Sequence, residues 1–383
     1  MDTTQPEHQQ SQNALLKRRF LSLPSLLSFA VAAALLLLLV TRFNLDWEAT
    51  WANIRAINIW LYLAAMGMYF ASFWFRGRRW QLLARNTRTI AADKGRVPST
   101  LRTAQFILIG WFVNSVMWLR LGDAYRAYLF AKESKGTFSW SLGTIVAERI
   151  SDIATILVVL VVSIVAFTLT TENTTASMLL LVVLAGVGFS IALLLAMRYY
   201  GQRIAHGLSV VLLLAMRYHE KRSAQLLARR IETAYARFQQ GTLGSFKQLP
   251  VVFVLGLAGW AFEIGRLYLV VSALGVDAPL ALIPIVALGH ALLSTVPTPG
   301  GVGVVEPGII GLLLISLEKS DAASVALVDR SITYLSVIAV GGTIFLVMQV
   351  MSKRKGRISD ALFDSVEQGN HTGELADKKH NAH

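Results

Sequence analysis

The sequence contains no cysteine, which excludes disulfide bonds, thiolate nucleophiles and cysteine-ligated metal sites. Charged residues are also scarce: they make up 15% of the 383 residues, against about 25% in an ordinary soluble domain, and hydrophobic residues make up 54%. The chain further lacks a Walker motif, a G-x-S-x-G motif, a D-x-D motif and paired histidines at metal-ligand spacing. We therefore expect no cofactor, no bound metal and no enzymatic activity.

Long apolar runs recur instead, and several approach the roughly 20 residues that cross a bilayer. They cover approximately residues 21–40, 57–75, 142–169, 176–197, 251–273 and 325–350. No small-residue cleavage site follows the first run, so we interpret it as a retained span and not as a signal peptide. The predicted fold class is an all-α polytopic membrane protein with about six full transmembrane spans.

Two more apolar stretches are short or interrupted. The first is stopped by R-L-G-D at 120–123, and the second contains S-T-V-P-T-P-G-G-V-G-V-V-E-P-G at 294–308. Proline and glycine break helices, and lipid tolerates a broken backbone only inside protein or beside a water-filled cavity. We therefore predict two re-entrant helical hairpins, at about 104–133 and 280–317. Asp123 is expected to cap the second helix of the first hairpin, and the second half-helix is expected to begin near Val302.

The positive charge selects a topology. The chain has 36 Lys and Arg against 23 Asp and Glu, a net charge of +13. If both hairpins are re-entrant, the basic loops at 76–102 and 198–247 share one side with both termini, and the other side holds only Arg42, Arg55 and Lys319. The positive-inside rule makes the basic side cytoplasmic, so this charge needs no nucleic-acid partner. Opposed hairpins also resemble the inverted repeats of transporters, on topology alone.

These assignments define the predicted domains. Residues 1–20 form a disordered cytoplasmic N-terminus, 21–350 form the transmembrane domain with the cytoplasmic basic loop 198–247, and 351–383 form a disordered basic cytoplasmic tail. The first run and the tail are rich in Lys and Arg at their cytoplasmic flanks.

One candidate site lies at the break in the first hairpin, where Arg120 and Arg126 flank Gly122 and Asp123. A helix N-terminus with two guanidinium groups is a good phosphate site. The alternative is an ordinary loop with a capping aspartate and surface arginines.

Charged residues also occur within long apolar runs. Glu148, Arg149 and Asp152 fall in the run at 142–169, with the two carboxylates four residues apart on one helix face. Glu263 and Arg266 fall at the centre of the run at 251–273, where their i, i+3 spacing lets them pair. A charge at membrane depth costs about 2.5–3.5 kcal/mol, so each of these needs a partner or water, and Arg120 or Arg126 could pair with Glu148 and Asp152. They are predicted to serve function, with a structural ion-pair network as the alternative.

The broken segment supplies the last candidates, Pro297, Pro299, Gly300, Gly301, Gly303 and Glu306. Its glycines would let backbone N–H groups converge on an anion. Glu306 would lie in the first turn of the following half-helix, so a bound phosphate there needs a cation or a protonated Glu306. Arg149, Arg266 and Arg330 are the candidates for that cation. His290 is expected to be a packed residue and not a ligand.

Three motifs occur along the chain in this order: R-L-G-D-A-Y-R-A-Y-L-F at 120–130, V-A-E-R-I-S-D at 146–152 and P-T-P-G-G-V-G-V-V-E at 297–306. Together they resemble the lysylphosphatidylglycerol synthase transmembrane region family, also called the flippase-like domain family. The resemblance implies a membrane domain that moves lipids between leaflets. In the best-understood members this domain is joined to a soluble aminoacyl-transferase domain, which this chain does not contain, so we expect no synthase activity.

The resemblance carries over to the candidates in those motifs, whereas Glu263, Arg266 and Arg330 rest on their depth alone. The predicted function is a flippase or scramblase that passes a phospholipid or lipid-linked headgroup through a polar intramembrane cavity. The expected partners are anionic or aminoacylated phospholipids of a bacterial plasma membrane, and a homo-oligomer is left open. The alternatives are a membrane enzyme, with Asp123, Glu148, Asp152 and Glu306 as acids, bases or magnesium ligands, and a proton-coupled transporter of a small solute.

Overall fold

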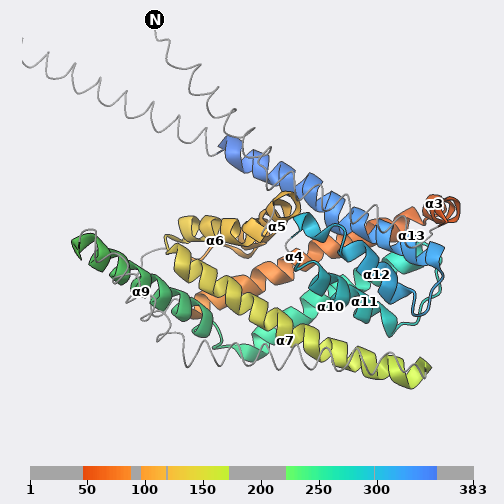
Figure 1. Ribbon diagram of the computed structural model, residues 1–383, viewed down its shortest axis with the longest axis horizontal. Helices are drawn as coiled ribbons and strands as arrows, with labels where there is room; N and C mark the ends of the chain where they lie inside the picture. Colours follow the sequence, from red (N-terminus) through yellow and green to blue (C-terminus); the bar gives the residue numbers. More distant parts are fainter. Residues whose placement is uncertain (1–45, 88–95, 118–119, 172–220, 297, 352–383) are drawn as a thin grey trace, which may run out of the picture.

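The computed structural model describes residues 46–87, 96–117, 120–171, 221–296 and 298–351. Within these ranges the protein is helical and has no strand (Figure 1). The predicted spans at 21–40 and 176–197, and the predicted disorder at 1–20 and 352–383, lie outside the described residues, while Met351, the first residue of the predicted tail, is still helical.

The remaining four predicted spans coincide with long helices. Three helices are long and apolar enough to cross a bilayer: α7 (Phe138–Thr171), α10 (Leu249–Ala273) and the helix that begins with α13 at Lys319 and continues to Met351. A fourth crossing results if α3 (Trp47–Arg55) and α4 (Ile59–Thr87), which meet at an angle of 86°, are counted as one. The protein is therefore a multi-pass membrane protein.

Helix α4 is longer than the sequence predicted. The arginines from position 76 onward were assigned to a loop, but α4 continues to Thr87 and packs along α10. Arg76 and Arg79 consequently lie on the buried face of the helix. The predicted end of this span, at about residue 75, is therefore too early. That prediction assumes that every arginine is exposed to solvent, whereas Arg76 and Arg79 have buried partners.

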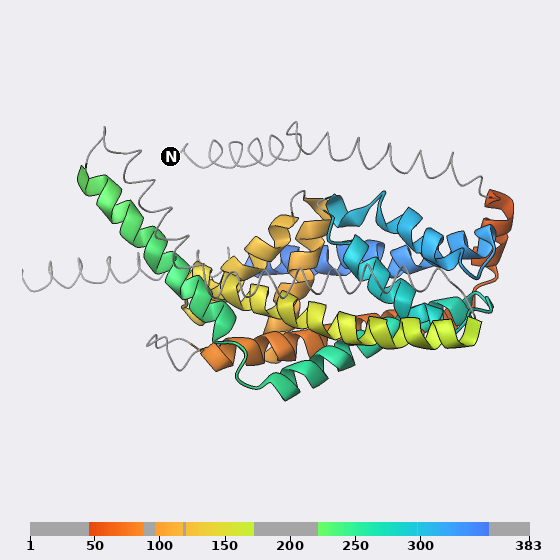
Figure 2. The same ribbon diagram turned by 60° about the horizontal axis from the view of Figure 1, so that its bottom comes forward.

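Two pairs of shorter helices lie at the positions of the two predicted hairpins, and the re-entry of these hairpins into the membrane from opposite sides stays a prediction. The first pair is α5 (Thr100–Val116) and α6 (Leu121–Ser134), which pack against each other. The second is α11 (Leu282–Leu293) and α12 (Val305–Leu313), joined through the 3₁₀ turn η3 (Pro299–Gly301). The ends of the two hairpins meet near the middle of the molecule (Figure 2).

A glycine contact closes the first hairpin. A Cβ atom at Gly122 would collide with the carbonyl oxygen of Gly110, and Asn114 Oδ1 accepts a hydrogen bond of 2.8 Å from the Gly122 N–H. The hairpin can therefore close this tightly only with glycine at position 122.

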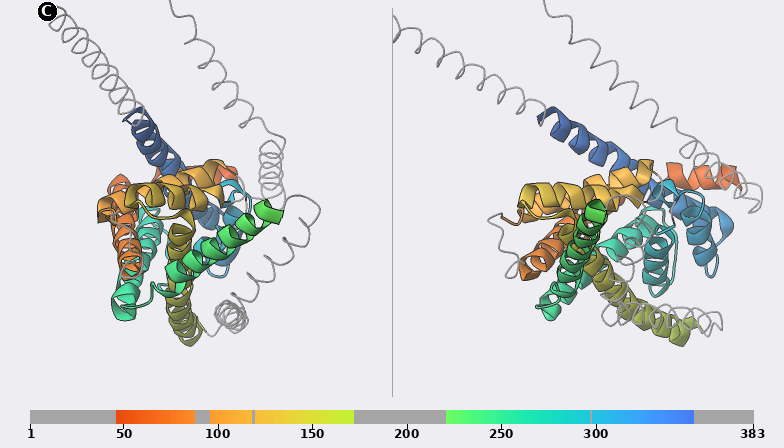
Figure 3. Two further views of the ribbon diagram at one scale, coloured as in Figure 1. Left: turned by 90° about the vertical axis from the view of Figure 1, so that its left-hand side faces the viewer. Right: turned by 60° about the vertical axis from the view of Figure 1, so that its left-hand side comes forward.

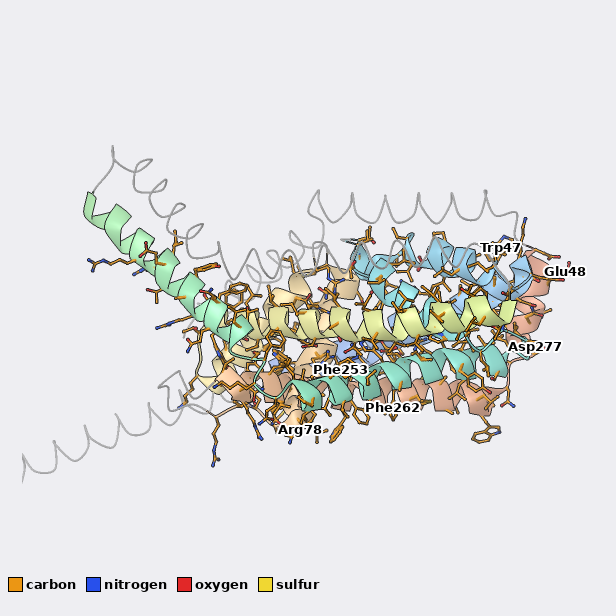
Figure 4. The ribbon with its side chains drawn as sticks, turned by 90° about the horizontal axis from the view of Figure 1, so that it is seen from below. Trp47, Glu48, Arg78, Phe253, Phe262 and Asp277 are labelled. Atoms are coloured by element: carbon orange, nitrogen blue, oxygen red, sulfur yellow. The ribbon has the colours of Figure 1, made fainter. Side chains whose placement is uncertain are left out.

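The predicted basic loop contains a regular helix, α9 (Lys221–Leu243), which packs against α7 and diverges from the bundle (Figure 3). At the other end of the molecule, α3 presents Trp47 and Glu48 near Asp277, in the connection between α10 and α11 (Figure 4). Asp46 is the N-cap of α3, and its Oδ1 accepts a hydrogen bond of 3.0 Å from the Ala49 N–H. The exposed Trp47 and Trp51 on this short helix have the amphipathic rings that favour a membrane–water interface.

Candidate functional site

The break in the first hairpin is centred on Arg120. This residue has left-handed backbone angles, with φ 52° and ψ 39°, and it precedes the first turn of α6. Left-handed backbone is costly for a residue with a Cβ atom, and such positions cluster at functional sites. Arg120 makes no capping hydrogen bond. The prediction that Asp123 caps this helix is therefore wrong: the N-cap is Arg120, and Asp123 lies within the first turn of α6 with its carboxylate turned toward arginines.

Asp123 is shared by three arginines. Its carboxylate lies 3.1 Å from Arg126 Nε and 3.0 Å from Arg149 Nη2, and Arg120 Nε lies 3.7 Å away. Arg126 is fully buried, while Arg120 and Arg149 are partly exposed. One carboxylate cannot neutralise three guanidinium groups, so positive charge remains at this point.

The inner face of α7 holds the next two carboxylates. Glu148 lies 2.8 Å from Arg126 Nη1, and Asp152 lies 2.6 Å from Arg79 Nη2. The same Arg79 nitrogen is 3.8 Å from Glu148, so both carboxylates lie on one helix face, as their spacing predicted. Arg126 also joins α6 to α7, which was one of the pairings considered from the sequence.

The centre of α10 is bound into a second network. Glu263 accepts hydrogen bonds of 3.2 Å from both Arg266 and Arg76, which confirms the predicted Glu263–Arg266 pair. Arg266 also contacts Asp329 on α13, and His290 Nδ1 lies 2.9 Å from Asp329 Oδ2. Asp329 is fully buried, and it holds α10, α11 and α13 together.

The broken segment folds onto Glu306. Gly300, Gly301 and Gly303 all have positive φ, and the Gly303 N–H donates a hydrogen bond of 2.6 Å to Glu306 Oε2. Arg330 Nε donates to Glu306 Oε1 at 2.8 Å, and Arg330 Nη2 donates to the Gly300 carbonyl at 2.9 Å. Of the three candidate cations, Arg330 is thus the one that pairs with Glu306.

This arrangement corrects one expectation. The glycine-rich turn was predicted to direct its N–H groups at an external anion, but the anion at the Gly303 N–H is Glu306 itself. The N–H groups of Gly301, Val302 and Val304 donate to carbonyl oxygens within the same turn. Pro297 lies outside the described residues, while Pro299 is buried in the 3₁₀ turn.

A cavity of about 220 Å³ lies between the two hairpins, bounded also by α4, α7, α10 and the helix that begins with α13. Its charged lining residues are Arg76, Arg120, Arg149, Asp152, Glu263, Arg266 and Arg330. Gly300 also lines it, whereas Asp123, Arg126, Glu148, Pro299, Gly301, Gly303 and Glu306 do not. Most of this second set lies behind the wall and holds the lining arginines or the turn in place.

Sequence reasoning missed several of the wall residues. Arg76 lies between two indole rings of the wall, with its guanidinium 5.2 Å from the ring centre of Trp111 and 4.8 Å from that of Trp260. The three-residue spacing of Arg76 and Arg79 could have indicated a buried helix face, while Trp111 and Trp260 carry no signal that separates them from interfacial aromatics. Asp329 was overlooked beside Arg330, although both occur in the same apolar run.

The groups around the cavity carry a small excess of positive charge. The described ion pairs around the cavity join seven arginines to six carboxylates, which leaves one positive charge when histidine is counted as neutral. The wall itself is more basic, with five arginines and two carboxylates. Among the described residues, no group of three His, Cys, Asp or Glu side chains could hold a metal ion. The site is therefore suited to an anion.

Comparison with known proteins agrees with these features. The model of the lysylphosphatidylglycerol synthase TM region matches residues 25–341. The chain belongs to this family.

Among its relatives, a UPF0104 membrane protein of Methanocaldococcus jannaschii is 27% identical over 241 residues, which cover 62% of this chain and 94% of the relative. A UPF0104 membrane protein of Methanothermobacter thermautotrophicus is 26% identical over 282 residues, or 69% of this chain and 78% of the relative. No solved structure matches.

Proposed function

We propose that this family member moves a phospholipid or lipid-linked headgroup between the leaflets of the membrane, as a flippase or scramblase. One observation carries the proposal: an arginine-rich cavity lies between two broken helix pairs in a multi-pass membrane protein. Broken helices in lipid require a polar or protein-filled environment, and intramembrane charges mark substrate pathways. The headgroup would pass through this cavity while the acyl chains remain in lipid.

The rim of the cavity supports a lipid over a soluble solute. Ile153 and Leu292 line the cavity and are 40% and 44% exposed. In a membrane protein, exposed apolar side chains face acyl chains, so a polar cavity with an apolar rim matches an amphiphile.

The carboxylates favour transport over chemistry. Asp123, Glu148, Asp152 and Glu306 are each held by at least one arginine. A carboxylate paired in this way is a poor magnesium ligand, because a guanidinium group already occupies at least one of its oxygens. The proposal therefore has no covalent step. We also propose that the protein lies in the plasma membrane and that both of its termini lie in the cytoplasm, as the positive-inside rule predicts.

The test is lipid movement in vesicles that contain the full-length protein. The fraction of labelled phospholipid that an impermeant quencher can reach is followed over time, for anionic, zwitterionic and aminoacylated lipids. We expect the protein to expose inner-leaflet label for at least one of these lipids. Combined Arg120→Gln and Arg149→Gln substitution should slow this at least tenfold, since both side chains line the cavity.

The matched control is Arg230→Gln, which removes an exposed arginine of α9 outside the cavity and should leave the rate unchanged. Vesicles with the protein that retain their asymmetry for every lipid would overturn the proposal. Covalent conversion of a lipid by the purified protein would replace it with the enzyme alternative.

A further inference from the structure

The charge around the cavity identifies the class of headgroup more narrowly. We propose that Arg120 and Arg149 bind a single phosphodiester that carries one negative charge, in a lipid whose headgroup is otherwise neutral. This inference rests on the proposed function for the lipid's movement, but the binding it describes can be measured separately.

Two of the five arginines in the cavity wall are accessible to a ligand. Of the five arginines in the cavity wall, Arg120 and Arg149 have side chains that are 27% and 35% exposed, whereas those of Arg76, Arg266 and Arg330 are less than 10% exposed. The less exposed three are each held by a carboxylate at 3.2 Å or closer. Arg120 and Arg149 therefore present the accessible guanidinium groups.

The charges of Arg120 and Arg149 are only partly neutralised by neighbouring groups. Arg149 reaches Asp123 at 3.0 Å, but Arg126 holds the same carboxylate at 3.1 Å. Arg120 lies 3.7 Å from it and instead donates a hydrogen bond of 2.7 Å to the Ser294 carbonyl. A carbonyl oxygen has no net charge, so the Arg120 charge is poorly compensated. A phosphate oxygen would be a stronger, charge-assisted acceptor.

The net charge of the ion-pair networks indicates how many negative charges the ligand can carry. Among the described residues, the ion-pair networks around the cavity leave one positive charge. It belongs to the group built on Asp123, Glu148 and Asp152, where four arginines meet three carboxylates. The networks of Glu263 with Asp329 and of Glu306 are balanced. One monoanion neutralises the site, whereas a second negative charge would be buried without a counter-ion, which is costly at low dielectric. The site therefore disfavours phosphomonoesters and diphosphates.

The apolar part of the cavity wall favours a lipid phosphate over a free phosphate ion. Inorganic phosphate and a lipid share the same oxyanion chemistry, but the wall also includes Ile153, Ile156 and Val337. These apolar groups contribute only if the phosphate is attached to glycerol and acyl chains. Hence a lipid should bind more tightly than the free anion.

The experiment is calorimetric titration of the full-length protein in a neutral detergent with short-chain lipids. Dihexanoyl phosphatidylglycerol has one charge, dihexanoyl phosphatidylcholine is neutral overall, and dihexanoyl phosphatidic acid adds a second charge at alkaline pH. We expect the phosphatidylglycerol to bind at least tenfold more tightly than either of the others, and inorganic phosphate to bind more weakly than the phosphatidylglycerol.

Two variants shift the balance in opposite directions. Arg149→Gln makes the site neutral, and it should abolish the preference for phosphatidylglycerol over phosphatidylcholine. Asp123→Asn adds one positive charge, and it should shift the preference toward phosphatidic acid. Arg149 is partly exposed, so its variant should fold even if the Asp123 variant does not. Arg230→Gln is the control with unchanged binding.

Equal affinity of the wild-type protein for phosphatidylglycerol and phosphatidylcholine would overturn the inference, as would an unchanged preference in Arg149→Gln. Inorganic phosphate that binds as tightly as the lipid would also overturn it, in favour of a soluble anion. The two proposals fail separately: selective binding without lipid movement removes the transport function and leaves the site. Lipid movement without charge selection would remove the proposed phosphodiester site and leave the transport function.

Discussion

At the scale of single residues, the described core of this membrane protein depends on paired charges. Asp329 is completely buried and lies against both Arg266 and His290. Removing one partner of a buried ion pair leaves the other charge without compensation, which costs more than the intact pair contributes. The cost of losing a residue here therefore depends on what its partners can still reach.

Asp329→Asn should lower the free energy of unfolding by about 3 kcal/mol, because Arg266 then depends on Glu263 alone and His290 loses its charged partner. The measurement is unfolding of the purified protein in mixed detergent micelles. Asp277→Asn is the matched control, since Asp277 is exposed, and it should change stability by less than about 0.5 kcal/mol. Equal stability of the two variants would contradict the role given to Asp329.

The sequence predicted part of this residue-level picture. The Glu263–Arg266 pair and the shared face of Glu148 and Asp152 follow from helical spacing, which is local. The partners Arg76, Arg79 and Asp329 are distant in the chain from the groups they hold. Spacing carries no information on such contacts, and a rule that places arginines in loops points away from them.

At the scale of elements, apolar runs predicted four described spans, and the proline- and glycine-rich breaks predicted both helix pairs. The details at the breaks were less accessible. Asp123 and the Gly303 N–H both have features of helix-terminus anion chemistry, yet each is satisfied from within the protein. The sequence shows that a donor or an acceptor is present, while only the fold shows which partner it contacts.

Gly122→Ala tests how tightly the first hairpin must close. The added Cβ atom would collide with the Gly110 carbonyl oxygen, so we expect a loss of about 1–3 kcal/mol in stability and a slower lipid-movement rate. Gly67→Ala is the control: no heavy atom lies within 4 Å of a Cβ atom there, and this helical position should gain up to about 1 kcal/mol. If Gly122→Ala behaves like Gly67→Ala, the hairpin does not depend on this contact.

At the scale of the whole molecule, the two ends differ in charge and composition. The basic helix α9 lies at one end, and α3 with the α10–α11 connection lies at the other (Figure 4). The positive-inside rule predicts that α9 lies in the cytoplasm and that Asp277 lies outside the cell.

The lack of cysteine makes this topology directly testable. Arg230→Cys and Asp277→Cys each introduce one thiol at an exposed position. In intact cells, an impermeant maleimide should label the Asp277 variant at once, and it should label the Arg230 variant only after lysis. Labelling of both from the same side would contradict the predicted topology and the opposed entry of the two hairpins.

The hydrogen bond from Arg120 to Ser294 joins the two hairpins through a main-chain acceptor. Its strength is independent of the side chain at position 294, so substitutions there leave the contact intact while the backbone path is kept. A single codon change at position 120 removes it. Relatives that keep the fold but lose this hydrogen bond should therefore differ at position 120 and not at position 294, while the packing of α5 against η3 still joins the hairpins.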